Sequence, residues 1–111
     1  MEMNDAVDTF AALGQPLRLS VLRRLVQAGP PGLTAGQIAE DHGTLANTLS
    51  SHLRVLSAAR LVTATREGRH IRYRADMEGL RTIMSFLLED CCGGRPALCR
   101  PVIAEIADLA C

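Results

Sequence analysis

Glycine and proline divide the chain into short segments, and this division constrains the fold more than any other feature. The main breaks fall at residues 14–16, 28–32 and 42–44. Both residue types interrupt regular structure, because glycine adopts left-handed backbone angles and proline lacks a backbone donor. Between the breaks, apolar residues recur at helical spacing. The predicted helices cover residues 5–13, 16–27, 34–40, 45–59 and 77–89, with a weaker helical pattern at residues 101–109.

One β-hairpin is predicted between the last two strong helices. Residues 61–66 and 70–74 have the composition of strands, and Glu67-Gly68-Arg69 supplies the turn. In the second strand arginine alternates with apolar residues, so one face is basic and the other apolar. No repeat or second unit is visible in the 111 residues. The sequence therefore predicts a single, mainly α domain with a β-hairpin.

The helix predicted at residues 45–59 has an unusual surface. Its inward stripe is expected to be Leu45, Leu49, Leu53 (or His52) and Leu56. Its opposite face carries Asn47, Thr48, Ser50, Ser51 and Arg54. A solvated helix normally mixes acids and bases, whereas small polar side chains can approach phosphates and base edges closely. His52, at the edge of the apolar stripe, is interpreted as a packed, hydrogen-bonded residue and not as a metal ligand.

Charge is distributed unevenly although the net charge is zero. Residues 44–75 carry six arginines against one acid, whereas residues 1–17 carry three acids and no base. A basic middle between acidic ends is typical of a nucleic-acid footprint. No apolar run is long enough to span a membrane, and the acidic N-terminus lacks the apolar stretch of a secretory signal. We therefore expect a cytoplasmic protein.

All four cysteines lie after position 90: Cys91, Cys92, Cys99 and Cys111. Adjacent cysteines are poorly placed to bond to each other, and cytoplasmic thiols stay reduced. Thiolates bind soft metals and metalloids, so Cys91, Cys92 and Cys99 are predicted to form a three-sulfur site across a Gly/Pro-bearing loop. Trivalent arsenic binds three thiolates, and antimonite has a similar coordination. Zinc normally takes four ligands. Cys111 could supply the fourth, so a zinc or cadmium site is an alternative.

Several motifs resemble those of the ArsR family of bacterial metal-responsive repressors. They are residues 12–19, residues 49–62 and the wing-like Arg66-Glu67-Gly68-Arg69 and Tyr73-Arg74. The resemblance covers roughly residues 9–90. It implies a winged helix-turn-helix homodimer on a near-palindromic operator. It also implies DNA contacts from Asn47, Thr48, Ser50, Ser51 and Arg54 on the recognition helix, and from Arg66, Arg69 and His70 on the wing.

The resemblance also indicates which residues form the inducer-binding site. Many members carry cysteines on the short helix before the turn, but residues 36–41 have none here. Others use histidines near the last helix, and residues 77–89 contain no histidine. The C-terminal cysteines are then the remaining candidate ligands, and in this the chain resembles arsenite-responsive members with C-terminal cysteines. We expect a DNA-binding and dimerisation domain at residues 1–90 and an inducer-binding tail at residues 91–111, with As(III), or Sb(III), bound by Cys91, Cys92 and Cys99.

Two alternatives share the same DNA-binding scaffold. In the first, oxidation pairs Cys91 or Cys92 with Cys99, and the chain acts as a thiol-redox switch. In the second, the thiols sense zinc or cadmium. An enzyme is disfavoured, because the sequence shows neither a nucleophile–base pair nor a Gly-rich cofactor loop.

Overall fold

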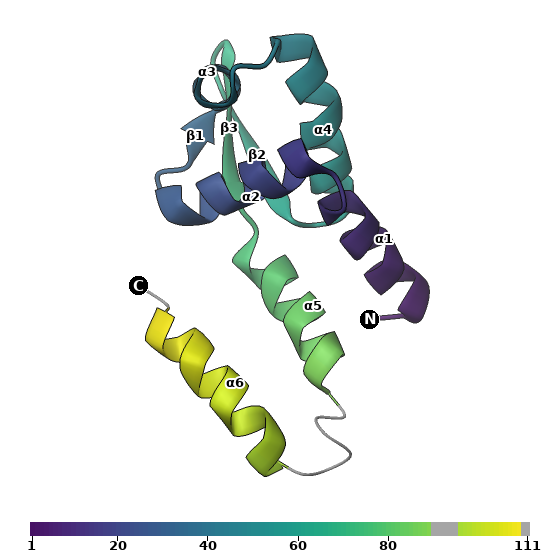
Figure 1. Ribbon diagram of the computed structural model, residues 1–111. Coiled ribbons are helices and arrows are strands. Elements are labelled where there is room, and N and C mark those ends of the chain that lie inside the picture. The colour runs from purple at the N-terminus through teal and green to yellow at the C-terminus, as the bar shows by residue number, and fades with distance from the viewer. Residues whose placement is uncertain (90–95, 110–111) are drawn as a thin grey trace.

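A computed structural model of the chain describes residues 1–89 and 96–109 (Figure 1). Within these residues it contains helices and a small sheet. The helices are α1 (Met3–Leu13), α2 (Pro16–Ala28), α3 (Ala35–His42), α4 (Ala46–Ala58), α5 (Met77–Leu88) and α6 (Pro96–Leu109). The strands are β1 (Leu33–Thr34), β2 (Val62–Glu67) and β3 (His70–Ala75). The predicted mainly α fold with one β-hairpin wing is confirmed.

Helix starts follow from local capping chemistry. Pro16 occupies the first turn of α2, and the Gln15 side chain accepts a hydrogen bond from the Arg18 amide at 2.8 Å. At α3 the predicted capping box forms: Thr34 accepts from the Gln37 amide at 3.3 Å, and the Gln37 side chain accepts from the Thr34 amide at 2.9 Å. Both helices therefore begin within a residue of their predicted starts.

The sheet is antiparallel, in the order β1-β3-β2. Strands β2 and β3 pair over their whole length, from Val62 opposite Ala75 to Glu67 opposite His70. β1 adds two residues to the other edge of β3. The sequence analysis did not predict β1, because two residues show no periodicity and their partners lie about forty positions away in the chain.

The core lies between α2, α3, α4 and the sheet. Its largest fully buried side chains are Val21, Leu25, Ile38, Leu49, Leu53, Leu56 and Leu61. Burying each such side chain contributes roughly 1.5–3 kcal/mol. Three of these leucines come from α4, and they hold one face of that helix against the body of the molecule.

The prediction was wrong for one residue of the α4 stripe, which does not lie in the core. Leu45 is 72% exposed, whereas Leu49, Leu53 and Leu56 are buried. Leu45 is the N-cap of α4, with φ −74° and ψ 146°, so its backbone is extended and not helical. Helical spacing therefore does not place its side chain on the buried stripe.

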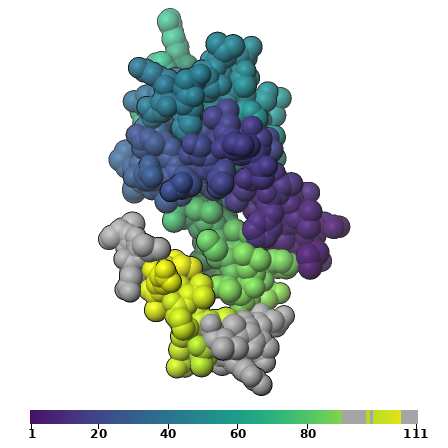
Figure 2. Space-filling view, in the orientation of Figure 1, coloured from purple at the N-terminus to yellow at the C-terminus, as the bar shows by residue number. Residues whose placement is uncertain are grey.

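The molecule is elongated, with extents of 50 × 31 × 23 Å. Its radius of gyration is 15.5 Å, against about 13 Å for a compact chain of this length. Helices α1, α5 and α6 form one end, and the wing and the start of α4 lie at the other (Figures 1 and 2). None of the described helices has the length and apolar character needed to cross a bilayer.

The end formed by α1, α5 and α6 exposes large apolar side chains in helical stripes. They are Met3, Val7 and Phe10 on α1, Met77, Met84 and Leu87 on α5, and Val102, Ile103 and Ile106 on α6. Small residues face inward on α1, where Ala6, Thr9 and Ala12 are buried. Exposed apolar stripes of this kind are typical of surfaces that bind a protein, a membrane or a ligand.

Candidate nucleic-acid interface

A tight turn sets the angle between α3 and α4. Gly43 ends α3 in the left-handed region at φ 59° and ψ 35°. Its amide donates to the Glu40 carbonyl at 3.2 Å, and the Thr44 amide donates to the Ala39 carbonyl at 3.1 Å. These bonds close α3 and turn the chain into α4, so the two helices form a helix-turn-helix pair.

The outward face of α4 carries the predicted recognition residues. Asn47, Thr48, Ser50, Ser51 and Arg54 are all exposed. The buried leucines of α4 lie on its other side, so the core holds the polar face toward solvent. The Asn47 side chain accepts a hydrogen bond from the Thr48 amide at 2.9 Å. The structure thus brings these five residues together on one accessible helix face.

His52 is half-buried and hydrogen-bonded, as predicted. Its partner is Arg18, whose Nη1 lies 3.3 Å from His52 Nδ1. The Arg18 Nε also donates to the Ala12 carbonyl at 2.6 Å. One side chain on α2 therefore touches both the end of α1 and the middle of α4. The sequence analysis did not single out Arg18, and its place within residues 12–19 was the only available signal.

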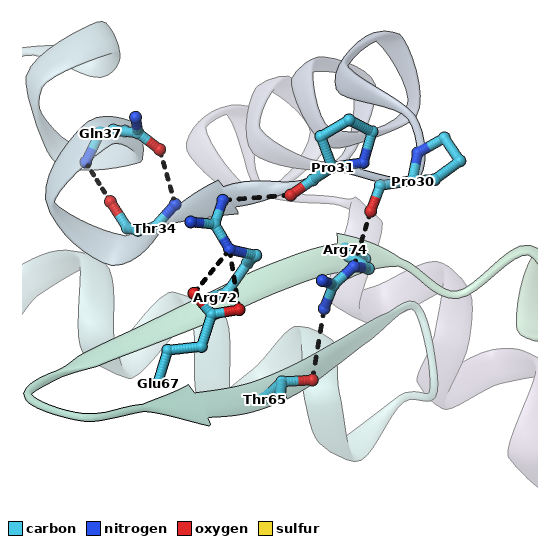
Figure 3. A network of polar contacts seen from close by, with 8 residues as sticks. All are labelled: Pro30, Pro31, Thr34, Gln37, Thr65, Glu67, Arg72 and Arg74. Atoms are coloured by element: carbon cyan, nitrogen blue, oxygen red, sulfur yellow. Dashed lines mark hydrogen bonds and ion pairs between the residues drawn. The ribbon is translucent and has the colours of Figure 1, made fainter.

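Two arginines of the wing, Arg72 and Arg74, make hydrogen bonds to other residues of the chain (Figure 3). Arg72 Nε donates to both Glu67 carboxylate oxygens at 2.9 and 3.0 Å, and its Nη1 donates to the Pro31 carbonyl at 3.1 Å. Arg74 Nε donates to the Pro30 carbonyl at 2.7 Å, and its Nη1 donates to Thr65 Oγ1 at 3.3 Å. We call these contacts the arginine clamp. The clamp ties the hairpin to the loop that follows α2.

The wing tip leaves three other basic groups exposed. Arg66, Arg69 and His70 are all exposed, and within residues 1–89 and 96–109 none of their side chains has a hydrogen-bond or ion-pair partner. They lie at or beside the turn that joins β2 and β3. This is the distribution expected of side chains that meet a phosphate backbone.

Replacing Arg66 or Arg69 by alanine should weaken DNA binding by a similar factor on every sequence. Each phosphate contact releases about one counterion, so the slope of log K against log salt should become shallower by about one per subunit. Fluorescence anisotropy over a salt series measures this slope. Arg81→Ala is the matched control, because Arg81 is an exposed arginine paired with Glu78 on α5. If Arg66→Ala leaves the slope unchanged, Arg66 does not contact phosphate.

The ion pair between Glu78 and Arg81 on α5 shifts the pKa of both side chains. The hydrogen bond from Arg81, followed by the attraction of its charge, lowers the pKa of the Glu78 carboxyl. Reciprocally, the pKa of Arg81 is raised. Both side chains are exposed, and they belong neither to the polar face of α4 nor to the wing tip.

The thiol site is described in part. Cys99 lies on α6 and is 5% exposed, so it is a buried helical residue, whereas the sequence predicted a helix only from residue 101. Helix α6 begins at Pro96, earlier than expected, and continues through Pro101. The Cys99 sulfur is engaged in a disulfide bond. The predicted ligands Cys91 and Cys92, and Cys111, lie outside the described residues. Within the described part, no three potential metal-binding side chains gather.

The helix-turn-helix pair matches a known sequence family. Residues 13–64 match the helix-turn-helix domain family. Comparison with curated protein sequences finds no match. Among solved structures, an ArsR-like transcriptional regulator from Rhodococcus sp. RHA1 is 28% identical, with a TM-score of 0.66 over 96% of this chain and 93% of that one. The chain has the fold of an ArsR-type DNA-binding regulator.

Two further solved structures are similar to this chain. One is the homodimeric winged helix-turn-helix DNA-binding domain of a possible ArsR-family regulator from Mycobacterium bovis. It is 26% identical, with a TM-score of 0.65 over 79% of this chain and 82% of that one. The other is NolR from Sinorhizobium fredii, 28% identical, with a TM-score of 0.62 over 79% and 85% of the two chains. The ArsR-type fold makes α4 the recognition helix and the β2–β3 hairpin the wing.

Proposed function

We propose that this protein is a homodimeric repressor that leaves its operator when trivalent arsenic binds the thiolates of Cys91, Cys92 and Cys99. The ArsR-type fold, with its polar α4 face and basic wing tip, is the observation that carries the DNA-binding half of this proposal. The recognition helices of such a dimer enter successive major grooves about 34–36 Å apart. Repression then depends on how the two subunits are held.

The apolar stripes of α1 and α5 support the dimer. Met3, Val7 and Phe10 on α1 are 43–66% exposed, and Met77, Met84 and Leu87 on α5 are 50–62% exposed. Neither stripe has a covering element within the described chain. Packing them against a second copy would remove this apolar surface from water and fix the distance between the two α4 helices.

The position of Cys99 supports the sensing half. The residue lies on α6, at the same end of the molecule as α1 and α5 (Figure 1). Cys99 is disulfide-bonded, so its thiol must be reduced before it can bind arsenic. On binding arsenous acid, each reduced thiol would give its proton to a departing hydroxyl, so that three S–As bonds form and three waters leave. Drawing Cys99 toward Cys91 and Cys92 would move α6 and, through it, the dimer interface.

The expected strength of the switch follows from linkage. A coupling free energy of about 1–3 kcal/mol would weaken DNA binding about 5–150-fold, and DNA would weaken inducer binding by the same factor. Antimonite should act in the same way, because its coordination is alike.

Arsenite should release the reduced protein from operator DNA, and Cys99→Ser should blunt this release. The measurement is a fluorescence-anisotropy titration with arsenite, after reduction and removal of the reductant. Cys111→Ser is the control variant and should respond like the original protein. Release by zinc but not by arsenite would contradict the metalloid proposal.

The disulfide at Cys99 favours a second candidate, a thiol-redox switch. In this case two thiols form the disulfide, two electrons and two protons pass to hydrogen peroxide, and two waters leave. Peroxide alone should then release DNA, and a reductant should restore binding. If peroxide acts on reduced protein and arsenite does not, the redox switch replaces the arsenic sensor.

A further inference from the structure

Leu45 occupies the position at which a recognition helix first meets the bases. It is the residue immediately before α4, and it is 72% exposed. In helix-turn-helix proteins the N-terminal residues of the recognition helix contact base edges in the major groove. An isolated exposed leucine is ordinary on a protein surface. Here, however, the leucine lies next to a run of exposed polar residues, Asn47, Thr48, Ser50 and Ser51.

Local helix chemistry favours a different residue at this position. An N-cap residue normally supplies a side-chain oxygen to the first amides of the helix, and serine, threonine, aspartate or asparagine do this best. Leu45 makes no such hydrogen bond. It therefore leaves the first turn of α4 without a side-chain cap and exposes a large apolar side chain at the same residue. Departures from local rules of this kind are expected at functional positions.

The dimer does not account for the exposure of Leu45. The start of α4 lies at the end of the molecule opposite α5 and α6 (Figure 1). The apolar stripes of α1, α5 and α6 therefore cannot share one continuous surface with Leu45. Ala46, the next residue, is exposed as well, so a small apolar patch stands at the tip of the recognition helix.

We propose that Leu45 recognises the 5-methyl group of a thymine in each operator half-site. The thymine methyl is the apolar feature of the base-pair edges in the major groove, and apolar side chains contact it. The polar α4 face beyond Leu45 would bind neighbouring base edges and phosphates. This assignment rests on the proposed DNA-binding function and adds a sequence preference to it.

The test removes one methyl group at a time. Duplexes bound by the protein are first selected from a random double-stranded DNA library. Each thymine of the selected half-site is then replaced by deoxyuridine, which lacks only the methyl group. At one position, binding should weaken about fourfold in one half-site and about fifteenfold in both, as expected for one buried methylene-sized group per half-site.

Leu45→Ser is the decisive variant, because serine is a good N-cap and the variant should fold at least as well as the original. It should bind thymine and deoxyuridine duplexes equally. Val55→Ser, at another exposed apolar residue of α4, should keep the methyl dependence. If deoxyuridine has no effect at any position, or if Leu45→Ser keeps the methyl dependence, the assignment is wrong.

Failure of this assignment can be separated from failure of the proposed function. If the unaltered protein selects no duplex from the library, the DNA-binding proposal itself fails. If it selects a duplex and the methyl groups do not matter, only the role of Leu45 is overturned. An equal loss of affinity by Leu45→Ser on thymine and deoxyuridine duplexes, with methyl dependence retained, would assign Leu45 a structural role instead.

Discussion

Alanine at position 79 should lower the free energy of unfolding by about 3 kcal/mol. Gly79 lies in the first turn of α5, where the helix passes the corner between α4 and β2. A Cβ atom there would lie 1.7 Å from the Arg60 carbonyl oxygen and 2.9 Å from its carbon. Both atoms belong to the backbone, so no side-chain rotation can relieve the overlap. The start of α5 would have to move away from this corner.

Urea unfolding at a fixed protein concentration measures this effect, since a dimer's stability depends on concentration. Gly36→Ala is the matched control. Gly36 lies in α3, and a Cβ there would meet only Thr34 Oγ1, at 4.0 Å. Alanine at position 36 should be neutral or stabilising by up to about 1 kcal/mol, because alanine favours helices. Equal midpoints for the two variants would show that the contact between α5 and Arg60 is not tight.

Arg18→Met should cost about 2 kcal/mol of stability and weaken DNA binding as well. The substitution keeps an apolar stem but removes the donors to the Ala12 carbonyl and to His52 Nδ1. Hydrogen bonds from charged donors contribute about 1.5–3 kcal/mol, and the stranded acceptors add a desolvation cost. Because His52 belongs to α4, the recognition helix loses a contact that fixes its position.

Two measurements separate these effects of Arg18. Urea unfolding reports the stability, and anisotropy on operator DNA reports the affinity under conditions in which the variant stays folded. Arg23→Met is the control, because Arg23 is an exposed arginine of the same helix. If the two methionine variants behave alike in both measurements, the Arg18 contacts contribute nothing specific.

The helices were predictable because their limits are set by local chemistry. The Thr34–Gln37 capping box and Pro16 at the start of α2 act over three or four residues, and the structure contains both. The polar α4 face was predictable for the same reason, since a helix places Asn47, Ser50 and Arg54 on one side. Whether those side chains contact DNA stays a prediction.

The errors have nonlocal or positional causes. β1 exists through its pairing with Tyr73 and Arg72, which the local sequence does not reveal. Leu45 was misplaced because the helical repeat does not extend to an N-cap residue with extended backbone angles. The helix predicted at residues 101–109 begins earlier and includes Cys99, because Pro96 and Pro101 are both accommodated in α6. The contact of Arg18 on α2 with His52 on α4 joins residues 34 positions apart, so the sequence pattern does not reveal it.

The arginine clamp determines how the wing approaches DNA. Arg72 and Arg74 join the hairpin to Pro31 and Pro30 before any ligand is bound (Figure 3). Loss of conformational entropy in this hairpin therefore accompanies folding and not association. Binding of the wing should then resemble rigid docking, without the large negative heat-capacity change of a segment that folds on its target. In the proposed dimer, a small rotation of one subunit would therefore move Arg66 and Arg69 together, because the clamp holds the wing rigidly.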